Sequence, residues 1–240
     1  MHQLKASALL AAAWACSIAG PLHAGEGHVD QAEKLDVKRG AIEMELQIVW
    51  AKARQDGDNN WAVVPTVGYG VTDTLALGVQ VEFERNGSDA LAFSTLGLQT
   101  KWVLLKADDA PIAIGIQPAI VIDRAGRIGS ETYFIAEVQR EQTDLVANLI
   151  YSTEPGHWGE DALAYVLRAD REIGEALAFG LEMGGELSGA SAGAHWGGPV
   201  MTLSPGDDGG ALPAFEFSFF GPLSAKAPAI QIRLEMGWEF

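Results

Sequence analysis

Cysteine is nearly absent from this sequence of 240 residues, since Cys16 is the only one. A single cysteine cannot form an internal disulfide, and its lack of partners excludes cysteine-based metal sites and dithiol redox motifs. Basic residues are also scarce: 16 lysines and arginines stand against 32 aspartates and glutamates, which gives a formal net charge of −16. This acidic excess argues against binding to nucleic acid.

Long hydrophobic runs are missing after the first 24 residues. The most apolar later stretch, residues 110–122, contains Gly115, Gln117 and two prolines. It is shorter than the roughly 20 residues that a transmembrane helix needs. If this chain spans a membrane, it must do so as a closed β-barrel, because only helices and closed barrels pair every backbone polar group in lipid.

The N-terminal residues have the features of an export signal. Lys5 supplies a positive charge, and residues 6–18 form an apolar core. We expect cleavage after Ala24, with Ala19 as the alternative. The next residues are polar and charged and predict a loose arm. The predicted division of the chain is a signal peptide (1–24), a flexible N-terminal arm (25–40) and an outer-membrane β-barrel (41–240).

The rest of the sequence alternates between apolar and polar residues, which is typical of β-strands with one apolar face. In residues 229–240, Ile230, Ile232 and Leu234 alternate with polar residues, and the length suits a tilted strand across a bilayer. Turn-forming residues separate twelve such segments. They are 41–53, 61–71, 75–84, 96–104, 112–122, 131–139, 145–152, 163–170, 177–186, 196–204, 212–220 and 229–240.

These segments predict an all-β fold, an antiparallel up-and-down transmembrane β-barrel of about 12 strands in which the last segment closes against the first. Aromatic residues near the segment ends predict two interfacial belts. One belt would contain Trp50, Trp61, Phe83 and Trp196, and the other Tyr69, Trp102, Trp238 and Phe240. Tight turns after the second, sixth and eighth segments indicate the periplasmic end. The same alternation also fits a soluble exported β-sandwich with its apolar face inward.

Three stretches carry a resemblance to a known group. The last strand ends on Phe240, residues 70–79 read GVTDTLALGV, and residues 195–199 read HWGGP. The closing strand resembles the C-terminal strand of bacterial outer-membrane barrels, which implies recognition by the barrel-insertion machinery. As a whole the chain resembles the Gram-negative outer-membrane barrels of the MetA-pathway phenol-degradation type, often described as transporters. The resemblance implies a location in the cell outer membrane, in contact with its lipid.

In a membrane barrel of this kind the polar strand face would line the lumen. This predicts a porin-like pore or transporter for small solutes, with an acidic lumen that favours cations. The alternative is a non-conducting structural or ligand-binding barrel with a plugged lumen, since twelve strands lie between filled and open barrels. The candidate pore-lining residues are Glu43, Glu45, Glu82, Glu84, Lys101, Glu137, Arg168, Asp170, Glu182, Glu186, Glu216, Arg233 and Glu235.

The sequence contains no zinc-binding spacing, phosphate-binding loop or dinucleotide fingerprint. His157 and His195 lie in predicted loops, and Ser188 and Ser191 precede the second of them. Their spacing does not define a pair of nucleophile and base. We therefore expect no enzymatic activity, no cofactor and no metal site.

Overall fold

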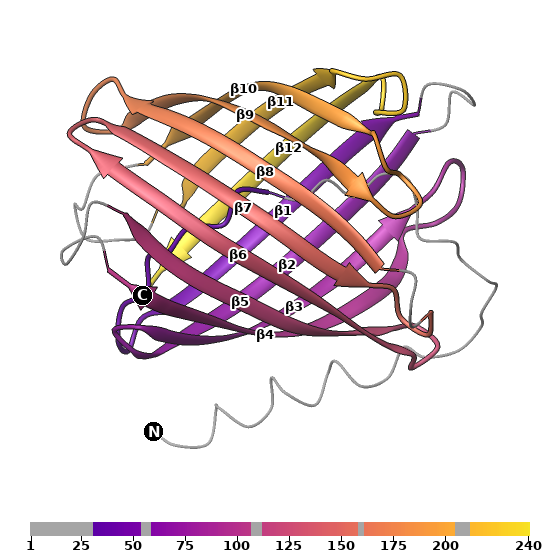
Figure 1. The fold of residues 1–240 in the computed structure, drawn as a ribbon, viewed down its shortest axis with the longest axis horizontal. Helices are drawn as coiled ribbons and strands as arrows, with labels where there is room; N and C mark the ends of the chain where they lie inside the picture. The colour runs from indigo at the N-terminus through magenta and orange to yellow at the C-terminus, as the bar shows by residue number, and fades with distance from the viewer. Residues whose placement is uncertain (1–30, 54–58, 107–111, 158–160, 205–211) are drawn as a thin grey trace.

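The computed structural model describes residues 31–53, 59–106, 112–157, 161–204 and 212–240, and these form a closed β-barrel (Figure 1). The strands are β1 (Ile42–Lys52), β2 (Asn59–Thr72), β3 (Leu75–Arg85), β4 (Ala92–Leu105), β5 (Ala113–Asp123), β6 (Ile128–Arg140), β7 (Thr143–Thr153), β8 (Asp161–Glu172), β9 (Leu177–Ser188), β10 (His195–Leu203), β11 (Ala214–Pro222) and β12 (Ile230–Glu239). Each strand pairs antiparallel with its neighbours in sequence. The predicted twelve-stranded antiparallel barrel is confirmed.

The barrel closes where β1 meets β12, with pairs running from Glu43 opposite Glu239 to Lys52 opposite Ile230. The backbone N–H of Ile42 donates to the carbonyl of Phe240, and the N–H of Phe240 donates back, both at 2.9 Å. Closure leaves no strand edge with unpaired backbone groups, which a bilayer would not tolerate. The predicted pairing of the last segment with the first is therefore confirmed.

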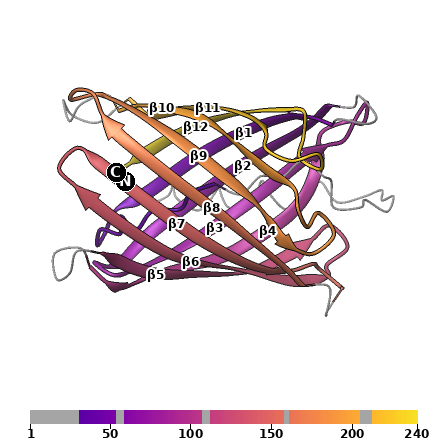
Figure 2. The same ribbon diagram turned by 45° about the horizontal axis from the view of Figure 1, so that its top comes forward.

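The two ends of the barrel differ. Both the start of β1 and the C-terminus lie at one end, together with the two-residue turns at 73–74 and 141–142. We call this the turn end and the opposite end the loop end. The strands cross between the ends at a steep tilt (Figures 1 and 2), as closure of a sheet requires. Within the described residues, no helix has the length and apolar character needed to cross a lipid bilayer.

Large apolar side chains cover the outside of the barrel. Leu98, Phe134 and Leu181, on three different strands, are 45%, 48% and 68% exposed. Their neighbours in sequence face the lumen, because successive side chains of a strand point to opposite faces. The observed faces follow the predicted alternation, with the apolar face outward as in membrane barrels rather than inward as in a sandwich.

Trp196 is an exception to the predicted aromatic belts. Its side chain is only 6% exposed, faces the lumen and packs on Phe220 with ring centroids 4.6 Å apart. Gly184 on the neighbouring strand makes room for it, since a side chain at that position would overlap the indole ring. The assignment of Trp196 to an outer belt was wrong, because its neighbour His195 takes the outward position.

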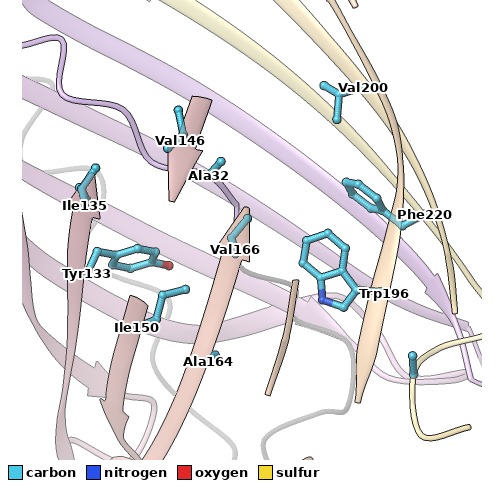
Figure 3. Packing of buried hydrophobic residues seen from close by; sticks show 11 residues of the cluster. Ala32, Tyr133, Ile135, Val146, Ile150, Ala164, Val166, Trp196, Val200 and Phe220 are labelled. Carbon is cyan, nitrogen blue, oxygen red and sulfur yellow. The ribbon is translucent and has the colours of Figure 1, made fainter. Parts of the chain in front are cut away.

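The lumen contains an apolar cluster as well as polar groups (Figure 3). Because of this cluster, residues 145–152 carry apolar side chains on both faces: Val146 and Ile150 face inward, while Leu145 and Leu149 face outward. A purely polar lumen would have produced a cleaner pattern. The cluster consists of Ala32, Tyr133, Ile135, Val146, Ile150, Ala164, Val166, Trp196, Val200, Phe220 and Ala227, with Leu35 packed against it.

Candidate functional site

A segment that belongs to no strand lies inside the barrel. We call residues 31–39 the plug segment. It is anchored at the turn end, where the N–H of Gly40 donates to the carbonyl of Gly70 at 2.7 Å. There Lys38 forms an ion pair with Glu239 at 2.8 Å, and the hydrogen bond raises the pKa of Lys38 above its ordinary value. From this anchor the segment runs into the lumen, where Ala32 is 8% exposed.

Side chains of the barrel wall bind the backbone of the plug segment. The N–H of Glu33 donates to Oδ1 of Asn148 at 2.7 Å, and Nδ2 of Asn148 donates to the carbonyl of Glu33 at 3.1 Å. The N–H of Leu35 donates to the carboxylate of Glu137 at 3.1 Å. A segment without a partner strand needs such bonds, because buried backbone groups are costly when unpaired.

Ion pairs add further contacts between the plug segment and the wall. The Lys101 ammonium lies 3.0 Å from a carboxylate oxygen of Glu33. Lys34 lies 3.4 Å from Asp144 and 3.7 Å from Asp170. These charges come from β4, β7 and β8, so they fix the segment on more than one side of the lumen.

Two glycines of the wall leave space for the plug segment. Any side chain at position 115 would overlap the side chain of Leu35, and one at position 70 would overlap the carbonyl of Lys38. In the structure Gly70 and Gly115 form a seat for residues of the N-terminal segment.

The polar composition of residues 25–40 predicted a flexible arm, whereas the described part of it contacts the lumen wall. Asn148, the wall residue that binds the plug backbone through both its amide atoms, was not among the predicted site residues. Asparagine is disfavoured within strands, and its place in the middle of β7 was the available signal. Residues 1–30, with the predicted signal peptide and cleavage site, lie outside the described residues.

A buried ion-pair cluster occupies the lumen beside β8 to β12. Arg233 is 0% exposed and donates to both carboxylate oxygens of Glu182 at 2.9 and 3.0 Å, and to Glu216 at 2.9 Å. Arg168 donates to Asp170 at 2.7 Å and to Glu216 at 2.6 Å. The carboxylates therefore outnumber the guanidinium groups, and their mutual contacts hold this side of the lumen filled.

A small cavity remains between the plug segment and strands β1 to β4. Its volume is about 90 Å³, which is smaller than the roughly 150 Å³ of a protein cavity that binds benzene. Glu33, Glu43, Glu45 and Lys101 line it, so its charged groups are mostly acidic. With the plug segment in place, this cavity is too small for an organic solute of ordinary size.

The predicted pore-lining residues lie on strand positions that face the lumen, but they belong to different local groups. Their role in conduction stays a prediction. Arg168, Asp170, Glu182, Glu216 and Arg233 form the buried cluster; Glu43, Glu45 and Lys101 line the cavity; Glu137 binds the plug segment; Glu82 and Glu84 accept hydrogen bonds from Thr95 and Ser94; Glu186 and Glu235 occupy lumen-facing positions on β9 and β12.

The two histidines predicted to lie in loops do not form a catalytic arrangement, and His195 is the first residue of β10. His157 is bonded to Glu154 at 3.2 Å, and Nδ1 of His195 lies 3.3 Å from the hydroxyl of Tyr165. Among the described residues, no group of three or more His, Cys, Asp or Glu side chains is placed to hold a metal ion.

A closed antiparallel barrel with an even number of strands, an apolar outer face and a largely polar interior has the architecture of bacterial outer-membrane proteins. Solved structures of that class share this fold. One is the COG4313 outer membrane channel from Pseudomonas putida F1, with a TM-score of 0.64, 12% identity, and coverage of 89% of this chain and 100% of that one.

Two porins are also similar in fold. The NanC porin gives a TM-score of 0.58 at 7% identity, with 81% of this chain and 98% of that one covered. The KdgM porin in complex with disordered oligogalacturonate gives 0.54 at 7% identity, with 83% and 98% covered. No protein-family model and no curated protein matches the sequence. The fold is thus established, and the resemblance to the MetA-pathway group stays a prediction.

Proposed function

We propose that this protein is an outer-membrane channel for small solutes whose lumen is closed by its own plug segment. The observation that carries the proposal is that the inner part of the plug segment, residues 31–35, occupies the lumen without being part of the wall. They are attached to the barrel covalently at one end only, through Gly40, and otherwise by hydrogen bonds, ion pairs and the Leu35 contact. Such contacts can break while the strands of the barrel stay paired.

Removal of the plug segment would enlarge the lumen on the side of β1 to β4. The wall there presents Glu43 and Glu45 against Lys101. Negative charge in a narrow, low-dielectric passage attracts cations and repels anions. We therefore propose that the open state favours cations, and that solutes with a positive charge pass more readily than anions of equal size.

The outer-membrane location and the transporter type named by the sequence resemblance belong to the same proposal. They are supported by the outward apolar face and by the shared fold of the COG4313 channel. We also propose that the barrel acts without catalysis, in keeping with the channel that shares its fold. We propose that Phe240 and its strand are recognised by the barrel-insertion machinery.

Planar bilayer recording tests the proposal directly. The full-length chain should give low or intermittent conductance, and Gly115→Leu should raise it, because the new side chain displaces Leu35 from its seat. In a KCl gradient the reversal potential should indicate preference for potassium, and Glu43→Gln with Glu45→Gln should reduce that preference. Gly174→Leu is a matched control, since Gly174 lies in the turn between β8 and β9 with open space around it and without a positive φ.

The alternative of a non-conducting barrel makes the opposite prediction. If the barrel does not conduct, the Gly115→Leu variant would show no conductance in planar bilayers even when its heat-modifiable gel mobility shows that it has folded. That outcome would reject the channel. Preference for chloride would leave the channel standing and reject the cation-favouring lumen.

A further inference from the structure

A groove crosses the outer surface of the barrel over strands β6 to β10, with a volume of about 720 Å³. Its floor is low because small residues occupy neighbouring outward positions there. Ala136 pairs with Ala147 on the neighbouring strand, and Ala169 and Gly197 also line the groove. The larger side chains of Leu145, Leu167, Leu181 and Leu223 line its sides. This part of the surface belongs to the apolar outer face.

Two arginines lie next to this groove, at the turn end. Arg140 and Arg171 are both cross-strand partners of Thr143, so the three residues form one row on β6, β7 and β8. Alternation places the row on the outward face, because Arg140 follows the outward position 138 and Arg171 follows the outward position 169. Both arginines are exposed.

Neither guanidinium has an ion-pair partner within the part of the chain that the structure describes. Glu141 and Glu175 lie in the adjacent turns and form no ion pair with either arginine. The two arginines are two strands apart, about 10 Å between their backbones. Their long side chains can therefore approach one small anion from either side, and the Thr143 hydroxyl lies between them.

We propose that the arginine row and the groove together bind one anionic phospholipid. The phosphate would accept hydrogen bonds from Arg140, Thr143 and Arg171, and an acyl chain would lie in the groove. Arginine matches phosphate geometry through paired N–H donors, and an apolar groove within a bilayer gains dispersion contacts from a chain that fills it. The site rests on the proposed outer-membrane location, with the turn end in the periplasmic leaflet, and does not depend on ion conduction.

Native mass spectrometry of the refolded full-length chain tests this site with dioleoylphosphatidylglycerol as the probe. The protein should retain one such lipid, and it should bind dioleoylphosphatidylcholine and dioleoylglycerol more weakly. Arg140→Gln with Arg171→Gln should weaken binding by about tenfold or more, as loss of charged hydrogen bonds predicts. Arg140→Lys keeps the charge but not the paired donors, so its affinity should be intermediate.

The groove and the arginines can be tested separately. Ala147→Phe fills the groove floor from the outer face, and it should weaken binding while both arginines remain. Lys52→Gln is the matched control, because Lys52 is exposed at the loop end, and it should bind like the unchanged protein. Heat-modifiable gel mobility shows for each variant that the barrel has folded.

Two results would overturn the proposal. Equal affinity of the unchanged protein and the double arginine variant would exclude the phosphate contact. Preferential retention of lipopolysaccharide over phosphatidylglycerol would assign the groove to a different lipid. A barrel that binds phosphatidylglycerol as expected yet stays silent in planar bilayers would support the lipid site and reject the channel, so the two proposals fail separately.

Discussion

Truncation of Leu35 to alanine is the most direct test of the closed lumen. Leu35 packs against the apolar lumen cluster and lies over Gly115. Removing a fully buried leucine side chain costs about 2–5 kcal/mol, and Leu35 is only partly buried, so the expected loss is about 2 kcal/mol. Since each 1.4 kcal/mol is a factor of ten in an equilibrium, the ratio of released to seated plug segment should rise about 30-fold.

Two assays report this ratio. Single-channel recording gives the open probability, which should increase in Leu35→Ala. Trypsin cleavage after Lys34 gives an independent measure, because a released segment is cleaved faster than one whose lysine is paired with Asp144. Leu98→Ala is the control: Leu98 is an outward side chain, 45% exposed, on a strand of the lipid-facing surface.

A lumen closed by Leu35 would be excluded if Leu35→Ala and Leu98→Ala gave the same open probability and the same cleavage rate after Lys34. A rise in cleavage without a rise in conductance would show that the segment leaves its seat but that the lumen stays closed by other groups. In that case the buried ion-pair cluster would be the barrier to solutes.

Three further perturbations follow from the site. Arg233→Met should lower the free energy of unfolding by about 3–5 kcal/mol, because it leaves buried carboxylates without a positive partner. Adding Glu182→Met should restore part of the lost free energy of unfolding. Denaturant titrations measure both effects. Asn148→Ala removes two hydrogen bonds to the plug backbone, worth about 1 kcal/mol each. Trypsin should therefore cleave the plug segment faster. The unfolding midpoint of the barrel should change little, because the strands keep their pairing. The pKa of Lys38 is raised, so its ion pair with Glu239 is fully present below the ordinary lysine pKa of 10.5 and is lost as the pH rises through the raised pKa. Release of the plug segment should therefore increase in that pH range. Lys38→Gln should abolish this pH dependence.

The strands that form the wall of the barrel could be predicted from the amino-acid sequence alone. Alternation with period two is a local property, because each residue along a strand must point to the face opposite its neighbour. Turn residues mark the ends of such runs, so the twelve strands could be placed to within a few residues. The apolar C-terminal strand with its terminal Phe240 also identified the partner of β1, since a membrane barrel has no free edge.

Tertiary structure decided what occupies the lumen. Whether Glu137 faces solvent or binds the N–H of Leu35 depends on a segment about 100 positions away in sequence, and no local pattern records that distance. The same holds for Trp196, which turned inward because Gly184 on the next strand leaves space for it. Alternation gives the side of the sheet for each residue, whereas the contents of an enclosed space depend on the shapes and charges of all the strands around it.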